Sequence, residues 1–494
     1  MTPSVHRPSK RGAARAALAL GAALGLALPL VALAASRDAD TPSAAPSFTR
    51  DVAPIIQQKC AGCHRIGGVA PFPLERARAI SSRAGLIASA VQARLMPPWP
   101  PGPRSPAFDG EAERTLAARE RATILAWAKA GGRVDGPALK PRSQKPVEVR
   151  EGESMLELAM PSAYRPRAAK GVTDDYRCFV LDPKLSGDVS VTSARIRPGA
   201  SKVVHHVILF RISAAQVAEA ARLDATSSGP GWTCFGGTGI GVGGSGGSVQ
   251  AALNDSNWIA AWAPGSSGDR LPDGNGVPLP AGSRIVMQVH YNLLNGNTPD
   301  RSRAVLTVAP ASAGLARVQT VLLPAPVELA CGKGEKGQLC NRTEALFDLS
   351  RKYGSTAAFV PAGLLLLCGR SASNVSPSPV SRCDRRIDTP TKILGVAGHM
   401  HLLGASIRLE LNPGTPRSRV LLDIPRWDFH WQSSYTLVDA VQTKPGDVVR
   451  VTCRHDVSRR AHGLHGVPKK PRYILWGEGT TDEMCLGLLQ VTRG

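Results

Sequence analysis

The pattern Gly398-His399-Met400-His401 is where residue types and spacing point most directly to metal chemistry. The segment before it, 391–397, is apolar and β-branched, and the segment after it, 405–411, alternates apolar with polar residues. Both segments are therefore predicted to be strands. Residues i and i+2 of a strand project from the same face, so His399 and His401 can reach one metal ion. The alternative is a pair of ordinary histidines on a solvated strand face.

Histidines also occur on two other predicted strands. His205 and His206 lie in the apolar stretch 201–210, and His290 ends the apolar run 284–291. Adjacent strand residues face opposite ways, so His205 and His206 can bind one metal only where the strand bulges or stops pairing. Three histidines would form a neutral site that suits copper or zinc. The alternative is one buried and one exposed histidine without a metal.

A third group of metal-binding residues comes earlier in the chain. Cys60 and Cys63, followed directly by His64, form a C-x-x-C-H pattern typical of covalent haem c attachment. His64 would supply one axial ligand. Met96 is the only methionine between residues 37 and 136, and a methionine opposite a histidine favours electron transfer. The alternative for the two cysteines is a redox dithiol. The alternative for Met96 is a core residue that does not bind the haem.

The surroundings of this pattern favour the haem interpretation. Helices are predicted over 51–59, 80–95 and 111–130, and Pro54 suits the first turn of the first helix. The region 47–136 resembles class I-type bacterial cytochrome c domains.

Four histidine and methionine motifs follow one another in the rest of the chain. They are His205-His206, Gln288-Val-His290-Tyr291, His399-x-His401 and Asp482-Glu-Met484-Cys485. This ordered set resembles the copper type II, ascorbate-dependent monooxygenases, which include peptidylglycine α-hydroxylating monooxygenase and dopamine β-monooxygenase. The resemblance extends from Asp175 to the end of the chain.

The resemblance implies two jelly-roll sandwiches that each carry one copper ion. His205, His206 and His290 would hold the copper that relays electrons, with Gln288 assisting the relay. The copper that binds dioxygen would have the ligands His399, His401 and Met484. A thioether sulfur is a soft ligand that favours Cu(I).

The resemblance also implies a disulfide between Cys453 and Cys485. Cys178 matches a family cysteine whose usual partner is missing, and Cys234 is the substitute that we expect. Composition alone leaves the pairing of the eight cysteines outside the haem pattern open.

The chain departs from the peptide-amidating enzymes at three positions. Ala397, Leu486 and Leu488 stand where those enzymes hold a substrate carboxylate with polar residues. The departure argues against peptide amidation and predicts an apolar or neutral substrate. His430, His455, His462 and His465 fit no family ligand position, and we expect them at the surface or behind the ligands.

Composition sets the cellular context. A basic start, the apolar run 16–33 and Ala32-Leu33-Ala34 predict a signal peptide over 1–34, with an uncleaved anchor as the alternative. Ten cysteines in an exported chain indicate an oxidising compartment, so the protein is predicted to be periplasmic or secreted and not integral to the membrane after cleavage. A net charge of +22 suggests a nucleic-acid partner, but export and 5% aromatic residues argue against one.

The predicted fold class is multidomain, with an all-α cytochrome c domain followed by two all-β antiparallel jelly-roll sandwiches. The predicted segments are the signal peptide over 1–34, the cytochrome c domain over 47–136, a linker over 137–149, and the two copper-binding sandwiches over 150–320 and 321–494.

The predicted function is a copper-dependent monooxygenase that hydroxylates a C–H bond of a small molecule with dioxygen. It would hold two copper ions and one covalently bound haem c. The haem would pass electrons from a small reductant or redox protein to the copper on His205, His206 and His290. Two alternatives are a non-catalytic periplasmic protein that binds copper or transfers electrons, and a zinc site for hydrolysis at these three histidines.

Overall fold

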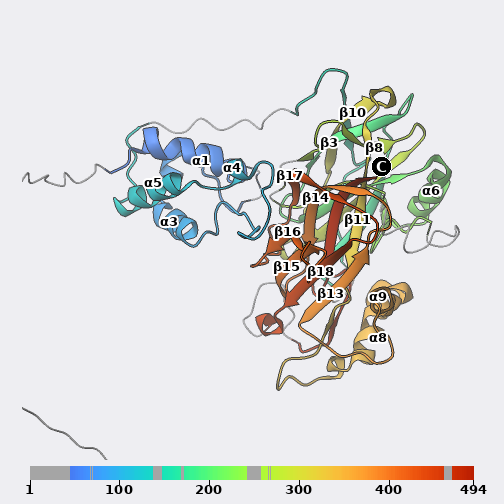
Figure 1. The fold of residues 1–494 in the computed structure, drawn as a ribbon. Helices are drawn as coiled ribbons and strands as arrows, with labels where there is room; N and C mark the ends of the chain where they lie inside the picture. Colours follow the sequence, from blue (N-terminus) through green and yellow to red (C-terminus); the bar gives the residue numbers. More distant parts are fainter. Residues whose placement is uncertain are drawn as a thin grey trace, which may run out of the picture. The chain divides into compact units, whose positions relative to one another are not determined.

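The computed structural model describes most of the chain after residue 44 (Figure 1). The described residues are 45–66, 68, 70–136, 147–168, 172–241, 257–264, 266, 269–460 and 470–493. The predicted signal peptide, most of the predicted linker, His462 and His465 lie outside them. The chain divides after residue 44, and all the described residues belong to the second unit, Ala45–Gly494.

The second unit begins with short helices around a small apolar core. They are a π-helical turn at Phe48–Val52, α1 (Ala53–Lys59), α2 (Ala77–Ser81), α3 (Ala84–Gln92), α4 (Glu111–Arg114) and α5 (Ala118–Lys129). Pro54 lies in the first turn of α1, where its missing N–H is not needed. Phe48, Ile56, Ile80 and Trp127 are fully buried and join these helices. The two later predicted helices are each split in two.

The first β region contains a five-stranded antiparallel sheet and one half of a nine-stranded sheet. The five strands, in spatial order, are β5 (Trp232–Thr233), β2 (Asp174–Leu181), β9 (Arg284–Asn292), β4 (Val204–Ile212) and β6 (Trp258–Trp262). The half of the large sheet consists of β1 (Ser154–Ala159), β10 (Arg303–Pro310), β3 (Val189–Arg197) and β8 (Asn275–Leu279), with β7 (Asp269–Arg270) beside β3. Phe179, Leu209, Leu279 and Leu306 belong to the shared core of these strands.

The second β region packs the rest of the nine-stranded sheet with a four-stranded sheet. The large sheet continues through β11 (Ala316–Pro324), β20 (Leu486–Arg493), β14 (Thr391–His399) and β17 (Ser434–Thr443). The four-stranded sheet is β13 (Val380–Arg386), β18 (Val448–His455), β15 (Gly404–Leu411) and β16 (Arg419–Ile424). Val321, Val396, Leu409 and Val451 are buried in their common core.

Helices, single helical turns and a two-stranded sheet accompany the main sheets of the β regions. The helices are α6 (Val217–Ala225), α8 (Arg342–Tyr353) and α9 (Ser355–Leu367), and β12 (Glu328–Leu329) pairs with β19 (Ile474–Leu475). Single helical turns occupy Ala214–Gln216, Leu293–Asn295, Ala311–Ala313, Gln338–Cys340 and Val457–Arg460. None of the helices among the described residues is long and apolar enough to cross a membrane.

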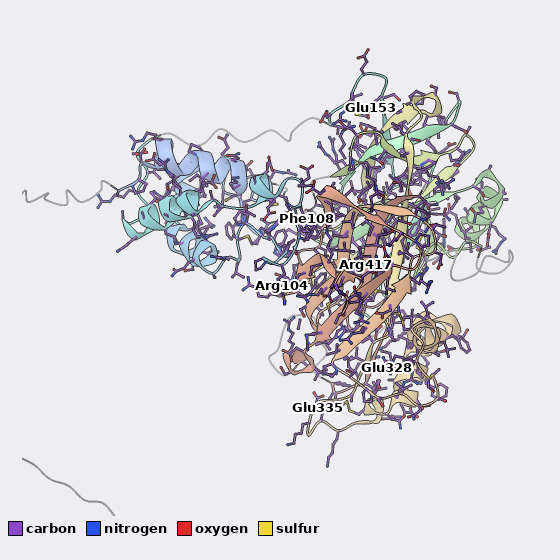
Figure 2. All side chains as sticks on the ribbon, in the orientation of Figure 1. Arg104, Phe108, Glu153, Glu328, Glu335 and Arg417 are labelled. Carbon is purple, nitrogen blue, oxygen red and sulfur yellow. A yellow bond between two sulfur atoms is a disulfide. The ribbon has the colours of Figure 1, made fainter. Side chains whose placement is uncertain are left out.

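The N-terminal helical segment is fastened to the second β region. The backbone N–H of Gly102 donates to the carbonyl of Asp423 at 2.7 Å, and the guanidinium of Arg104 binds the Asp423 carboxylate at 3.0 Å. Phe108 forms an isolated bridge with Leu437 of β17, and its ring lies 5.1 Å from that of Tyr435. Figure 2 labels Arg104 and Phe108 where this segment meets the strands.

The predicted fold class is therefore wrong. The described residues are mostly β-sheet with few, short helices, and no separate all-α domain is present among them. The nine-stranded sheet also runs through both β regions, because β11 pairs in parallel with β8 through Ala316–Asn275 and Arg317–Gly276. Helices α8 and α9 further interrupt the second β region. The fold class depends on backbone pairing and side-chain contacts between distant segments. The strand patterns in the sequence do not specify these contacts.

Candidate metal centre

Three histidines converge on one point of the five-stranded sheet. His206 of β4 pairs with His290 of β9, and the register shifts between Val204 and His206. The shift leaves His205 out of the ladder, so the strand bulges at this position. Such a bulge is what allows His205 and His206, although adjacent, to bind one metal ion. One ring nitrogen each of His205, His206 and His290 lies within 4.8 Å of the others.

The hydrogen bonding of two of these rings suits metal binding. His290 places Nε2 at 2.8 Å from the Asp174 carboxylate, and its Nδ1 lies 3.3 Å from Nδ1 of His206. A proton on Nε2, donated to Asp174, leaves the Nδ1 lone pair directed into the cluster. Both nitrogens of His205 are buried without a hydrogen-bond partner among the described residues. A buried ring nitrogen without a partner costs free energy, and a metal ligand bond would remove that cost.

Asp174 is a candidate site residue that the sequence analysis did not identify. It is 2% exposed on β2, next in the sheet to β9, and Thr480 also donates its hydroxyl and its backbone N–H to the same carboxylate. Hydrogen bonds from His290 and Thr480 hold the pKa of Asp174 below its usual value, although burial alone would raise it. Asp174 belongs to no recognisable sequence motif, so no sequence signal could have identified it.

Gln288 contacts the loop that contains Cys234, and its role in electron relay stays a prediction. It lies two residues before His290 on β9 and is buried, but its amide donates to the carbonyls of Cys234 at 2.9 Å and Gly237 at 3.1 Å. These bonds hold the loop that carries the Cys178–Cys234 disulfide.

The His-x-His pair lies at the end of β14, on the nine-stranded sheet. His399 places Nδ1 at 2.6 Å from Oε1 of Gln432, and His401 places Nδ1 at 3.2 Å from the carbonyl of Asp482. Protons on both Nδ1 atoms leave both Nε2 lone pairs free for one metal. Gln432 also donates to the Phe429 carbonyl at 2.8 Å, which fixes its orientation.

Met484 lies on the segment that contacts both of these histidines. Asp482, two residues before it, accepts from His401, and Leu486, two residues after it, pairs with His399 across β20 and β14. Met484 itself is buried, at 6% exposure. The structure therefore brings its backbone to the His-x-His pair, and its role as a sulfur ligand stays a prediction.

The two histidine groups are neighbours in space. The ring centroids of His206 and His399 are 6.3 Å apart. Phe429 lies between the groups, because its ring stacks on His205 at 4.3 Å and lies 6.0 Å from His401. Phe429 and Gln432 come from one loop, which joins β16 to β17 and which the sequence analysis did not identify.

Burial keeps four of these rings neutral. It lowers the pKa of His205, His206 and His401 well below the usual histidine value and that of His399 to about 4. Among the smaller causes, neighbouring histidines lower the pKa of each ring further. Neutral imidazole is the form that binds a metal, so this environment suits copper or zinc.

The histidine of the C-x-x-C-H pattern is held by a backbone carbonyl, and its role as an axial haem ligand stays a prediction. His64 lies within hydrogen-bond distance of the Phe72 carbonyl through Nδ1, at 2.9 Å, so Nε2 can act as a ligand. Cys60 and Cys63 are free thiols, and burial raises the pKa of Cys60 to about 12. Met96 is half-buried in the turn after α3, and its role as second axial ligand stays a prediction.

The remaining cysteines form four disulfides, which are Cys178–Cys234, Cys331–Cys340, Cys368–Cys383 and Cys453–Cys485. The last one joins β18 to the residue directly after Met484.

His430 is an exposed loop residue, whereas His455 is buried near the Glu483 carboxylate at 3.6 Å.

Comparisons with known proteins bear on the second histidine group. Residues 373–490 match the family model described as copper type II ascorbate-dependent monooxygenase, C-terminal domain. This match supports the family resemblance and includes His399, His401 and Met484. No curated protein matches the chain.

The solved structures add no argument about fold or function. A Paenibacillus xanthan lyase has 9% identity and a TM-score of 0.16, with 72% of this chain and 28% of that chain covered. The chain thus spans less than a third of that protein's length. An allantoicase has 11% identity and a TM-score of 0.14, with 61% of this chain and 86% of that chain covered.

Proposed function

We propose that this protein is a copper-dependent monooxygenase that hydroxylates a C–H bond of an apolar or neutral small molecule. The observation that carries the proposal is the pair of adjacent histidine groups, each with ring nitrogens free for a metal. Copper, when bound, supplies the one-electron chemistry that activates dioxygen. The family match over residues 373–490 supports the class of reaction.

The two groups have different ligand chemistry and so different proposed roles. His205, His206 and His290 form a neutral three-nitrogen set that tolerates both copper oxidation states, which suits electron relay. The other set combines His399 and His401 with the soft sulfur of Met484, which favours the Cu(I) form that binds dioxygen. Asp174 and Gln432 orient one ring in each set.

An apolar surface beside His399 supports the proposed substrate class. Ala397 pairs directly with Leu488, and His399 pairs with Leu486, so all four side chains share one face of the sheet. All four are half-buried. No cation is among them, and burying a substrate carboxylate there without a partner would be costly. Apolar contact, at about 0.8 kcal/mol per buried CH₂, would provide binding.

Electrons are proposed to enter through a haem c attached to Cys60 and Cys63, with His64 and Met96 as axial ligands. The donor would be a small reductant or a redox protein. The segment after this motif reaches the loop of Gln432, because Arg114 donates to the Ser433 hydroxyl at 2.9 Å. Four disulfides together with the predicted signal peptide support a periplasmic or secreted location.

The test measures oxygen transfer directly. Copper-loaded protein with a reductant is incubated with candidate apolar compounds under ¹⁸O-labelled dioxygen, and products are screened by mass spectrometry. Incorporation of one labelled oxygen, coupled to oxygen consumption, supports the proposal. Met484→Leu should retain copper at the three-histidine set and lose hydroxylation.

Two results would reject the proposal. Copper-loaded protein that transfers electrons but consumes no oxygen with any compound would be a non-catalytic copper protein. Binding of zinc in place of copper, with hydrolysis as the activity, would assign the histidines to another class of enzyme.

A further inference from the structure

The helix pair α8–α9 exposes large apolar side chains to solvent. Phe359 and Leu366 of α9 are 72% and 64% exposed, and Phe347 of α8 is 58% exposed. Figure 1 shows α8 and α9 next to each other beside β13. These residues play no part in the proposed oxygen chemistry.

The exposed residues of α9 form one continuous stripe. Ser355, Phe359, Gly363 and Leu366 are exposed at successive turns, with Val360 beside them. Helical residues three and four apart lie on the same side, so the stripe is a single face. No charged residue occurs anywhere in Ser355–Leu367. A surface helix normally carries charged groups on its outer face, and this one carries none.

The hairpin cannot turn this face inward. The opposite face of α9 is already buried, with Leu364 in the core of the second β region. Disulfides Cys331–Cys340 and Cys368–Cys383 fix the chain before α8 and after α9. Arg342, at the start of α8, binds the buried carboxylate of Glu328 at 2.6 Å, and Figure 2 labels Glu328 beside the hairpin. The apolar face is therefore held toward solvent by the rest of the fold.

The chain segment that contains the stripe is basic. Residues 331–370 contain six lysines and arginines against three acidic residues, and the whole chain has a net charge of +22. Lys333, Lys336 and Arg351 are exposed, and Arg370 follows α9. An apolar helix face in a basic segment matches an anionic lipid surface, because apolar burial and charge attraction then act together.

The length of α9 determines whether this helix could cross a membrane or only lie on its surface. Helix α9 has 13 residues, which is about 20 Å at 1.5 Å per residue. The hydrocarbon core of a bilayer is about 30 Å thick, so α9 is too short to cross it. We propose that the α8–α9 hairpin docks on an anionic lipid bilayer, with Phe359 and Leu366 entering the boundary between headgroups and acyl chains.

A second copy of the chain is a poorer occupant of this face. A two-fold contact would bring the same surface of both copies together, and with it Arg351 and the other basic residues of each. Like charges would oppose that contact, and anionic lipids would neutralise them.

Vesicle co-sedimentation tests the proposal on the chain that begins at Ala35, which lacks the predicted signal peptide. The chain should bind vesicles of phosphatidylglycerol with phosphatidylcholine, and bind vesicles of phosphatidylcholine alone much less. The double variant Phe359→Gln/Leu366→Gln should lose at least about tenfold in partitioning, because burial of even one large apolar side chain strengthens partitioning by roughly tenfold or more. Met155→Gln, at an apolar residue 52% exposed on β1, is the matched control and should bind as the wild type does.

A second measurement does not depend on the double variant folding. Phe359→Trp should show blue-shifted tryptophan emission, relative to the wild-type background, when anionic vesicles are added. Unchanged emission, or equal binding by the double variant and wild type, would overturn the proposal. So would loss of a lipid-free dimer in the double variant by analytical ultracentrifugation, because the stripe would then be an interface between copies. The copper content and ¹⁸O incorporation of the same variants report on the proposed function separately.

Discussion

At the scale of single residues, the candidate metal centre depends on groups that are not ligands themselves. Asp174 and Gln432 each accept a hydrogen bond from one ring nitrogen of a histidine. In both cases it is the nitrogen that faces away from the proposed metal. A histidine whose second nitrogen is held in this way presents one defined tautomer, and loss of such a partner typically weakens metal binding about 10–100-fold.

Asp174→Asn tests this at the three-histidine set. An amide can donate to His290 Nε2 and so favour the wrong tautomer, and we expect copper affinity there to fall about 10–100-fold. Competition with a Cu(I) chelator measures the affinity. Asp175→Asn is the control, since Asp175 accepts from Tyr164 and Arg167 and makes no hydrogen bond to these histidines among the described residues. An equal loss in both variants would indicate a general effect on folding.

Glu483 predicts a pH dependence of stability. Burial raises its pKa to about 8, while burial lowers the pKa of the adjacent His455 to about 4, so both are neutral near pH 7 despite their 3.6 Å separation. Between pH 4.5 and 8 the folded state keeps a proton on Glu483 that the unfolded state releases. Stability should therefore fall as pH rises, by up to about 1.4 kcal/mol per pH unit.

Glu483→Gln should remove this slope, because an amide does not titrate. Chemical unfolding of copper-free wild type and variant across this pH range measures the difference, and contributions from other groups cancel. A stability difference between the two proteins that does not change with pH would show that Glu483 is ionised in the fold.

The side chain at Ala397 should control substrate choice. Ala397→Arg places a cation beside Leu488 in the apolar face next to His399, so it should lower kcat/KM for a neutral substrate and raise it for a carboxylate analogue. Matched neutral and carboxylate compounds provide the comparison. A wild-type preference for the carboxylate would contradict the apolar-substrate proposal.

At the scale of elements, the loop between β16 and β17 links both histidine groups. It supplies Phe429, which stacks on His205, and Gln432, which binds His399. The neighbouring Ser433 accepts from Arg114 of α4. One short loop therefore contacts both histidine groups and the helical segment that follows the C-x-x-C-H pattern.

Gln432→Leu separates the two copper sets. His399 would lose its 2.6 Å hydrogen-bond partner, and we expect about 10–100-fold weaker copper binding at His399 and His401 with the three-histidine set unchanged. A Cu(I) titration should then show one tight step and one weak step. Ser433→Ala, which removes the Arg114 contact instead, should retain two tight steps. Equal weakening of both steps would show that the loop, not the single hydrogen bond, sets the affinity.

At the scale of the whole molecule, the C-x-x-C-H pattern and the β regions belong to one compact unit. Contacts of Gly102, Arg104 and Phe108 with β16 and β17 fasten the helical segment to the region that carries His399. Asp423 is 4% exposed and also binds Arg408, so the contact is part of the packed structure.

Cys60→Ser with Cys63→Ser should lose the haem spectrum, keep two copper ions, and still hydroxylate with a small-molecule reductant. The cysteines lie outside both histidine groups, so they would serve electron entry and not C–H cleavage. Steady-state oxygen uptake with a small reductant and with a protein donor distinguishes the two routes. A folded, copper-loaded variant that is inactive with every reductant would contradict the electron-entry role.

The sequence by itself determined which residues have metal-binding chemistry. His399 and His401 are two apart on a strand that its apolar pattern predicts, and His205-His206 required a bulge that the structure contains. The C-x-x-C-H pattern and the ordered motifs likewise depend only on short spacing along the chain. Such local patterns follow from backbone periodicity, which neighbouring residues set.

Only the tertiary structure decided what surrounds these residues. Asp174 reaches His290 from 116 residues away, and Gln432 reaches His399 from 33. The continuous nine-stranded sheet and the attachment of the helical segment to β17, which made the predicted fold class wrong, also rest on such pairings. These contacts form because packing brings buried polar groups within reach of partners they would otherwise lack. No pattern within one short stretch of sequence specifies which distant residue that partner is.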